Sequence, residues 1–141
     1  MARLLAIDYG LKRIGIAATD PDQIIASPLE VITPAELMKY IDGYVKNNEV
    51  EGIVVGYPSR LDNSDTDITA KVRNIAAELR KRFPAVQVHL HDERFTSAMA
   101  MKSMIAGGVK KKDRRDKKLI DKVSAALILQ SWLEQRSLRK D

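Results

Sequence analysis

The sequence contains no cysteine and no long apolar run. Without cysteine the chain can form no disulfide bond, and it has no thiolate to act as a nucleophile or a metal ligand. No apolar run reaches the ~18 to 20 residues that a membrane-spanning helix needs, and the stretch 1–5 is too short for a secretory signal. Repeats, low-complexity tracts and linkers are absent as well. These absences predict one domain, residues 1–141, that works in the cytoplasm and not in a membrane.

Composition and charge leave open what the protein binds. Hydrophobic residues make up 45% of the chain and charged residues 30%, which is ordinary for a globular protein. Lysine and arginine number 24 against 19 aspartate and glutamate, so the formal net charge is +5. This balance is compatible with an anionic partner, but by itself it favours nucleic acid only slightly.

The first third of the sequence predicts a β-hairpin, a further strand and a helix. Apolar runs at 3–8 and 13–19 are separated by Tyr9-Gly10-Leu11-Lys12, which is the pattern of a hairpin. A third short strand is predicted over 24–29. Thr33-Pro34-Ala35-Glu36 then has the pattern of a capping box with proline at the first helical position, so a helix is predicted to run to about residue 47.

The rest of the sequence alternates strands and helices. Strands are predicted over 52–55 and 86–90, and helices over 68–79, 96–108 and 119–134. Strands joined through helices pair in parallel, whereas the opening hairpin is antiparallel. We therefore predict an α/β fold with a mixed five-stranded sheet and helices on both faces, a three-layer α/β/α architecture.

Acidic residues fall at the ends of these predicted elements. Asp8 ends the first strand, Asp92 and Glu93 follow the last strand, and Asp121 opens the final helix. If the four acids converge at one sheet edge, their hard oxygen ligands suit two divalent cations of the kind that assist phosphodiester hydrolysis. The spacing does not establish this convergence, because each acid could also be a turn or capping residue.

Four short motifs together resemble the YqgF family. They are Asp8-x-Gly10-x-x-Arg13-Ile14-Gly15, the turn Gly56-x-Pro58, the stretch Asp92-Glu93-Arg94-x-Thr96-Ser97, and the helix that carries Asp121. Each motif alone is weak, but their order and spacing together are specific, and the similarity covers 4–133. The resemblance implies a ribonuclease H-like fold. Family members are described as nucleases that mature the 5′ end of pre-16S ribosomal RNA and as Holliday junction resolvases.

The resemblance also implies roles for individual residues. By similarity, Asp8, Glu93 and Asp121 are the catalytic residues and the ligands of Mg²⁺ or Mn²⁺. Asp92 suits the site less well, because adjacent strand residues point to opposite faces. The implied function is a metal-dependent nuclease that processes pre-16S rRNA during ribosome biogenesis. A Holliday junction resolvase in DNA recombination and repair is the alternative, and a non-catalytic RNA-binding assembly protein is a further one.

A basic run before the final helix is predicted to contact nucleic acid. Residues 109–118, "VKKKDRRDKK", contain seven basic residues and two acidic ones. Because the run leads into the helix with Asp121, its charges would lie near the metals and hold phosphates without reading sequence; the alternative is a solvated loop. The expected nucleic-acid-binding residues are Arg13, Arg94, Lys110, Lys111, Lys112, Arg114 and Arg115. The protein is expected to be a monomer or a weak homodimer.

Single motifs in the sequence also fit two other functions, an ATPase and a zinc site. Actin-like and sugar-kinase ATPases also open with an Asp-x-Gly hairpin that binds phosphate. Those folds need two such domains to enclose a nucleotide, and 141 residues supply one. His89 and His91 share one strand face and could bind zinc, but no third ligand at a suitable spacing supports such a site.

Overall fold

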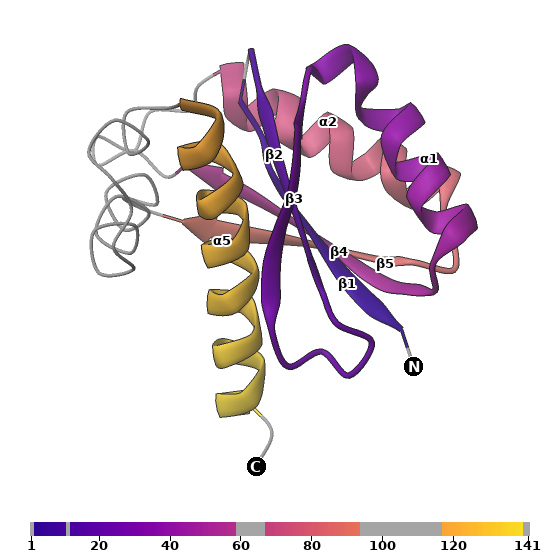
Figure 1. Ribbon diagram of the computed structural model, residues 1–141. Helices are drawn as coiled ribbons and strands as arrows, with labels where there is room; N and C mark the ends of the chain where they lie inside the picture. Colours follow the sequence, from indigo (N-terminus) through magenta and orange to yellow (C-terminus); the bar gives the residue numbers. More distant parts are fainter. Residues whose placement is uncertain (1, 11, 59–66, 94–116, 140–141) are drawn as a thin grey trace.

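The computed structural model describes residues 2–10, 12–58, 67–93 and 117–139; residues 57, 58, 67–69, 92, 93, 117–119, 121 and 137–139 are described by their backbone alone. A five-stranded sheet has the strand order β3-β2-β1-β4-β5 and carries helices on both faces (Figure 1). The strands are β1 (Arg3–Asp8), β2 (Ile14–Thr19), β3 (Ala26–Ile32), β4 (Val50–Pro58) and β5 (Gln87–Glu93), and the helices are α1 (Leu37–Asn47), α2 (Asp67–Arg82) and α5 (Lys117–Arg139).

The sheet is mixed, as the sequence predicted. β1, β2 and β3 pair antiparallel, whereas β1 pairs parallel with β4 and β4 pairs parallel with β5. α5 covers one face of the sheet, and α1 and α2 cover the other (Figure 1). This arrangement confirms the three-layer α/β/α architecture. The predicted helix at 96–108 and residues 109–116 of the basic run lie outside the described residues.

The third strand and the last helix begin and end at other residues than the sequence predicted. β3 begins at Ala26, not at residue 24, and continues to Ile32. The reason is that Asp20 Oδ1 accepts hydrogen bonds from the backbone N–H groups of Ile24 and Ile25, each at 2.8 Å, which holds both residues in the preceding turn. α5 extends over 117–139 and so exceeds the predicted 119–134 at both ends.

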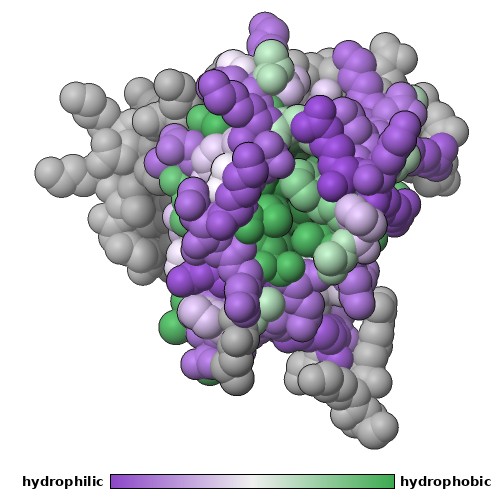
Figure 2. All heavy atoms as spheres, turned by 90° about the vertical axis from the view of Figure 1, so that its right-hand side faces the viewer, coloured by the Kyte–Doolittle hydropathy of each residue, from purple (hydrophilic) through white to green (hydrophobic). Residues whose placement is uncertain are grey.

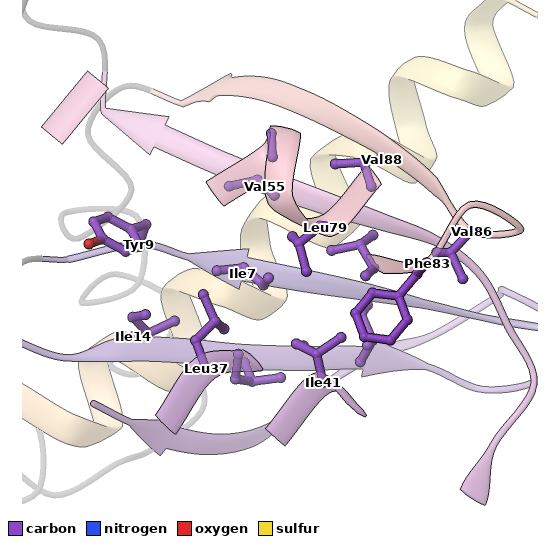
Figure 3. Close-up of a cluster of buried hydrophobic side chains, with 14 of the residues drawn as sticks. Ile7, Tyr9, Ile14, Leu37, Ile41, Val55, Leu79, Phe83, Val86 and Val88 are labelled. Carbon is purple, nitrogen blue, oxygen red and sulfur yellow. The ribbon is translucent and has the colours of Figure 1, made fainter. Parts of the chain in front are cut away.

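The two faces of the sheet bury different kinds of side chain. Leu5 of β1 belongs to a cluster beneath α1 and α2, together with Ile7 and with Tyr9, which follows the strand (Figure 3). Leu4 and Ala6 belong to a cluster beneath α5. Small residues such as Ala6, Ala17 and Ala125 line the α5 side, so this helix can lie close to the sheet. On the opposite side, hydrophilic side chains flank an apolar strip (Figure 2).

The start of α1 has the predicted capping box. Glu36 Oε1 accepts hydrogen bonds from the Thr33 N–H at 3.0 Å and from the Thr33 hydroxyl at 2.7 Å. A 3-10 turn, Pro34–Glu36, leads into the helix, which buries Leu37 and Ile41 on one side. In the part of the chain that the structure describes, no helix is both long and apolar enough to cross a membrane.

Candidate functional site

Asp8 is the last residue of β1 and lies between two glycines. It pairs with Gly15 of β2 on one side and with Gly56 of β4 on the other. Neighbouring strands are about 5 Å apart, so a residue with a Cβ at either position would place a side chain next to Asp8. Alternation along β1 puts Asp8 on the face of Leu4 and Ala6, which α5 covers. Neither residue that pairs with the half-buried Asp8 therefore carries a side chain at this point.

Glu93 reaches the same edge of the sheet from β5. Asp8 of β1 pairs with Gly56 of β4, and Gly56 pairs in turn with His91 of β5. Glu93 follows His91 by two residues and pairs with Pro58 at the end of β4. Alternation places position 93 on the face of His91 and position 92 on the other face. β1 and β5 are two strand spacings apart, ~10 Å. The backbone thus brings Asp8 and Glu93 to one edge and one face, and separates Asp92 from them.

α5 crosses this face of the sheet in the direction from the carboxyl-terminal end of β1 to the amino-terminal end of β1. Ile128 packs directly on Gly56, where an added Cβ would lie 2.4 Å from Ile128 Cδ1. Near the other end of the helix, Arg136 Nη1 donates a hydrogen bond of 2.6 Å to Gln23 Oε1, in the turn between β2 and β3. Asp121 precedes Ile128 by seven residues, about two helical turns or ~10 Å. Its backbone therefore lies toward the edge at which Asp8 and Glu93 stand.

The first turns of α5 hold a second polar group. Asp121 lies in the second turn, because the helix begins at Lys117; the expectation that Asp121 opens the helix is therefore wrong. Ser124, one turn later, is buried, and its Oγ has no hydrogen-bond partner among the described residues.

The two histidines of β5 pack against α5. The His89 ring stacks on Trp132 with centroids 4.5 Å apart, and His91 Nε2 lies 3.2 Å from Ser131 Oγ. Burial, followed by the positive charge of Arg80, lowers the pKa of His89, so its ring is neutral near pH 7. Both histidines thus have packing roles. Among the described side chains, which exclude residues 93 and 121, no three His, Asp or Glu are grouped so that they could hold a metal ion.

The turn after β1 requires glycine at position 10. A Cβ at Gly10 would come within 2.5 Å of the backbone oxygen of Arg13, a contact that the backbone would have to move to relieve. The close approach places Arg13 next to the end of β1. Arg13, expected to bind nucleic acid, is therefore at the same end of the sheet as Asp8. Tyr9, between them in the chain, is buried on the opposite face with Ile14 (Figure 3).

The structure describes some of the expected site residues and not others. It describes Asp8 and Arg13 with their side chains, and Glu93 and Asp121 by their backbone. The remaining expected contacts lie outside the described residues: Arg94, Lys110, Lys111, Lys112, Arg114 and Arg115. Sequence reasoning missed that Gly15 and Gly56 flank Asp8. The available signal was a glycine within each of two apolar strands, which often marks a close approach.

Comparison with known proteins gives one family and a set of similar sequences. The model of a family described as "RuvX: Holliday junction resolvase" matches residues 2–135. A protein of Christiangramia forsetii is 48% identical over 94% of this chain and 98% of its own length, and one of Amoebophilus asiaticus is 47% identical over 94% of each. A protein of Bacteroides fragilis is 44% identical over 98% of this chain and 100% of its own. All three are named "Putative pre-16S rRNA nuclease".

Among solved structures, the fold is similar to that of T. thermophilus RuvC in complex with a Holliday junction substrate. The TM-score is 0.53, and the alignment covers 96% of each chain at 17% sequence identity. RuvC has a ribonuclease H-like fold. The similarity therefore confirms that fold for this chain.

Proposed function

The chain belongs to the RuvX (YqgF) family, as its motifs predicted, and from this we propose that it is a metal-dependent nuclease that processes the 5′ end of pre-16S rRNA. Relatives named "Putative pre-16S rRNA nuclease" are 42–48% identical to it over almost the whole chain, from the Christiangramia forsetii protein at 48% to one of Porphyromonas gingivalis at 42%. The observation that carries the proposal is the position of Asp8, at the end of β1 between Gly15 and Gly56. The carboxylate there shares one edge of the sheet with Glu93 of β5.

Asp8, Glu93 and Asp121 would hold Mg²⁺ or Mn²⁺. Carboxylate oxygens are the hard ligands that these ions prefer. The donor set fits, because the backbone brings Asp8 and Glu93 to one edge of the sheet and the start of α5 runs toward that edge. When bound, the cations supply an activated water and a counter-charge for the leaving oxygen. Asp92 is left out of the site, since strand alternation assigns it to the other face.

The chain's own residues would position the nucleic acid around this site. Neither Gly15 nor Gly56 adds a side chain of its own beside Asp8. Ile128, seated on Gly56, fixes how close α5 lies to the same edge. Arg13 and Arg94, with the basic residues at 110–115, would neutralise phosphates on either side of the scissile bond. We further propose that the protein acts in the cytoplasm, as a monomer or a weak homodimer.

Resolution of a Holliday junction is the second candidate, favoured by the description of the family model. The two substrates make different demands, because symmetric cleavage of a four-way junction requires two active sites and therefore a dimer. A non-catalytic RNA-binding protein on the same fold would need no metal site. The grouping of Asp8 and Glu93 at one edge of the sheet would then have no catalytic role.

One assay distinguishes these functions. Wild type and Asp8→Asn are incubated with Mg²⁺ and either a pre-16S RNA that carries its 5′ leader or a four-way DNA junction. We expect wild type to cleave the RNA at its 5′ region and Asp8→Asn to be inactive with an unchanged melting temperature. Preferential cleavage of the junction would favour the resolvase. Equal RNA binding by both proteins without cleavage would favour the non-catalytic role.

A further inference from the structure

Two neighbouring isoleucines are exposed in the turn between β2 and β3. Ile24 is 66% exposed and Ile25 is 63% exposed, more than any other large hydrophobic residue in the described part of the chain. Single exposed aliphatic residues are common on protein surfaces. Two adjacent exposed isoleucines at the tip of a hairpin form a protruding apolar patch. They lie at the end of the sheet away from Asp8 and serve no role in the proposed active site.

This turn, residues 20–25, is held by a dense set of hydrogen bonds. Asp20 Oδ1 accepts from the N–H groups of Ile24 and Ile25, and the Asp20 N–H donates to the Ile25 carbonyl at 3.2 Å. The Gln23 N–H donates to the Asp20 carbonyl at 2.9 Å. The bonds from Ile25 and then Ile24 lower the pKa of Asp20, so its carboxylate stays charged at neutral pH. The isoleucines are thus exposed in one fixed arrangement.

Gln23 fastens the turn to three other parts of the protein. Its backbone has φ 58°, a left-handed conformation that costs energy for any residue except glycine. Its side-chain Nε2 donates to the carbonyl of Ala2 at 2.8 Å and to Glu51 Oε2 at 3.1 Å, and its Oε1 accepts from Arg136. A strained residue secured by Ala2 before β1, by Glu51 of β4 and by Arg136 of α5 indicates that the shape of the turn matters. Preorganisation of this kind reduces the entropy cost of binding.

Acidic residues outnumber basic ones around the isoleucines, although the whole chain has a net charge of +5. Asp20 and Asp22 belong to the turn, Glu51 contacts it through Gln23, and Glu49 lies beside Arg3. The basic residues at the turn are Arg3, which donates to the Thr19 carbonyl, and Arg136, which donates to Gln23. The excess of acidic residues makes this surface less suited to RNA phosphates than to a basic partner. It also disfavours a symmetric pairing of two copies, since acid would meet acid. A basic protein surface with an apolar pocket is complementary to both its charge and its shape.

We propose that the 20–25 turn binds a basic protein that accompanies the precursor RNA, with Ile24 and Ile25 inserted into an apolar pocket and the surrounding acids paired with lysine or arginine. This inference rests on the proposed function, because it assigns a surface to the protein component of that substrate. The edge of the sheet that holds Asp8 and the 20–25 turn lie at opposite ends of β1. The chain can therefore hold RNA at one end and protein at the other.

The test compares one RNA with and without its proteins. The probe is a transcript of the 5′ region of pre-16S rRNA, either naked or assembled with purified small-subunit ribosomal proteins. Binding is measured for wild type, for the double variant Ile24→Ser/Ile25→Ser, and for Leu90→Ser as a matched control. Leu90 is 38% exposed and lies on β5, at the other edge of the sheet. Asp22→Lys tests the charge.

We expect the double variant to lose about tenfold or more in affinity for the assembled particle and nothing for the naked RNA, with an unchanged melting temperature. Leu90→Ser should bind both probes like wild type, and Asp22→Lys should bind the particle more weakly with a smaller salt dependence. Equal binding of the particle by wild type and double variant would overturn the proposal. So would an equal loss on naked RNA, or a change in the sedimentation of the free protein. Cleavage of the naked RNA by wild type tests the proposed function separately.

Discussion

Gly56 of β4 and Ile128 of α5 are in direct contact at the edge of the sheet where β1 ends. An added Cβ at position 56 would lie 2.4 Å from Ile128 Cδ1 and 3.1 Å from both Cγ atoms. Gly56 is also the β4 partner of Asp8. The contact therefore sets how closely the helix that carries Asp121 approaches the strand that carries Asp8.

Replacing Gly56 with alanine should destabilise the protein through this contact. We expect Gly56→Ala to lower the free energy of unfolding by about 1–3 kcal/mol, because the overpacked methyl displaces Ile128 or α5. Ile128→Val removes Cδ1 and should cost about 0.5–1.5 kcal/mol by itself. The double variant should lose less than the sum of the two, as measured by urea denaturation. Strict additivity would show that the two positions do not interact.

Stability should decrease when the solution is acidified below about pH 6.5. Burial against Trp132, and then the charge of Arg80, lowers the pKa of His89 from its ordinary value of 6.5. The unfolded chain therefore takes up the proton first, so this contribution is complete above pH 6.5 and is lost as the pH falls through the lowered folded value. His89→Phe keeps an aromatic ring on Trp132 and should flatten this dependence. Denaturation curves between pH 5 and 8 test it, and an unchanged slope would refute the assignment.

The basic run should govern the salt dependence of binding. Each phosphate contact that is lost should reduce the slope of log affinity against log salt by about 0.7–0.9. Replacing Lys111, Lys112 and Arg114 with alanine should thus weaken binding to every sequence alike, flatten the slope, and leave metal binding unchanged. Fluorescence anisotropy at several salt concentrations measures this. If the triple variant binds as tightly as wild type in low salt, the run is a solvated loop.

The sequence predicted the fold well and the edges of elements less well. Apolar runs and the Thr33–Glu36 capping box were sufficient for the order of the described strands and helices, because these signals are local. The start of β3 was misplaced, since the apolar pair Ile24–Ile25 resembles a strand until the Asp20 side chain bonds its N–H groups. The length of α5 was underestimated, because its ends carry charged residues that fit a loop as well as a helix.

For the site, the motifs named the acids, but the sequence alone could not reveal their surroundings. That Gly15 and Gly56 flank Asp8 depends on strand register, which joins residues far apart in the chain. The packing of His89 and His91 on α5 depends in the same way on the position of Trp132, more than 40 residues later. Such relationships follow from tertiary structure and leave only weak traces, such as a glycine inside a strand.

The most direct test of the metal site compares two neighbouring acids of β5. Glu93→Gln and Asp92→Asn each replace a carboxylate with an amide of the same shape, one residue apart. The rate of Mg²⁺-dependent cleavage of the pre-16S RNA leader is measured for both variants and wild type. Loss of a true ligand should exceed the about 10- to 100-fold cost of losing a group that only supports one, so we predict at least ~100-fold slower cleavage by Glu93→Gln and near-normal cleavage by Asp92→Asn. Equal losses, or a greater loss for Asp92→Asn, would contradict the account.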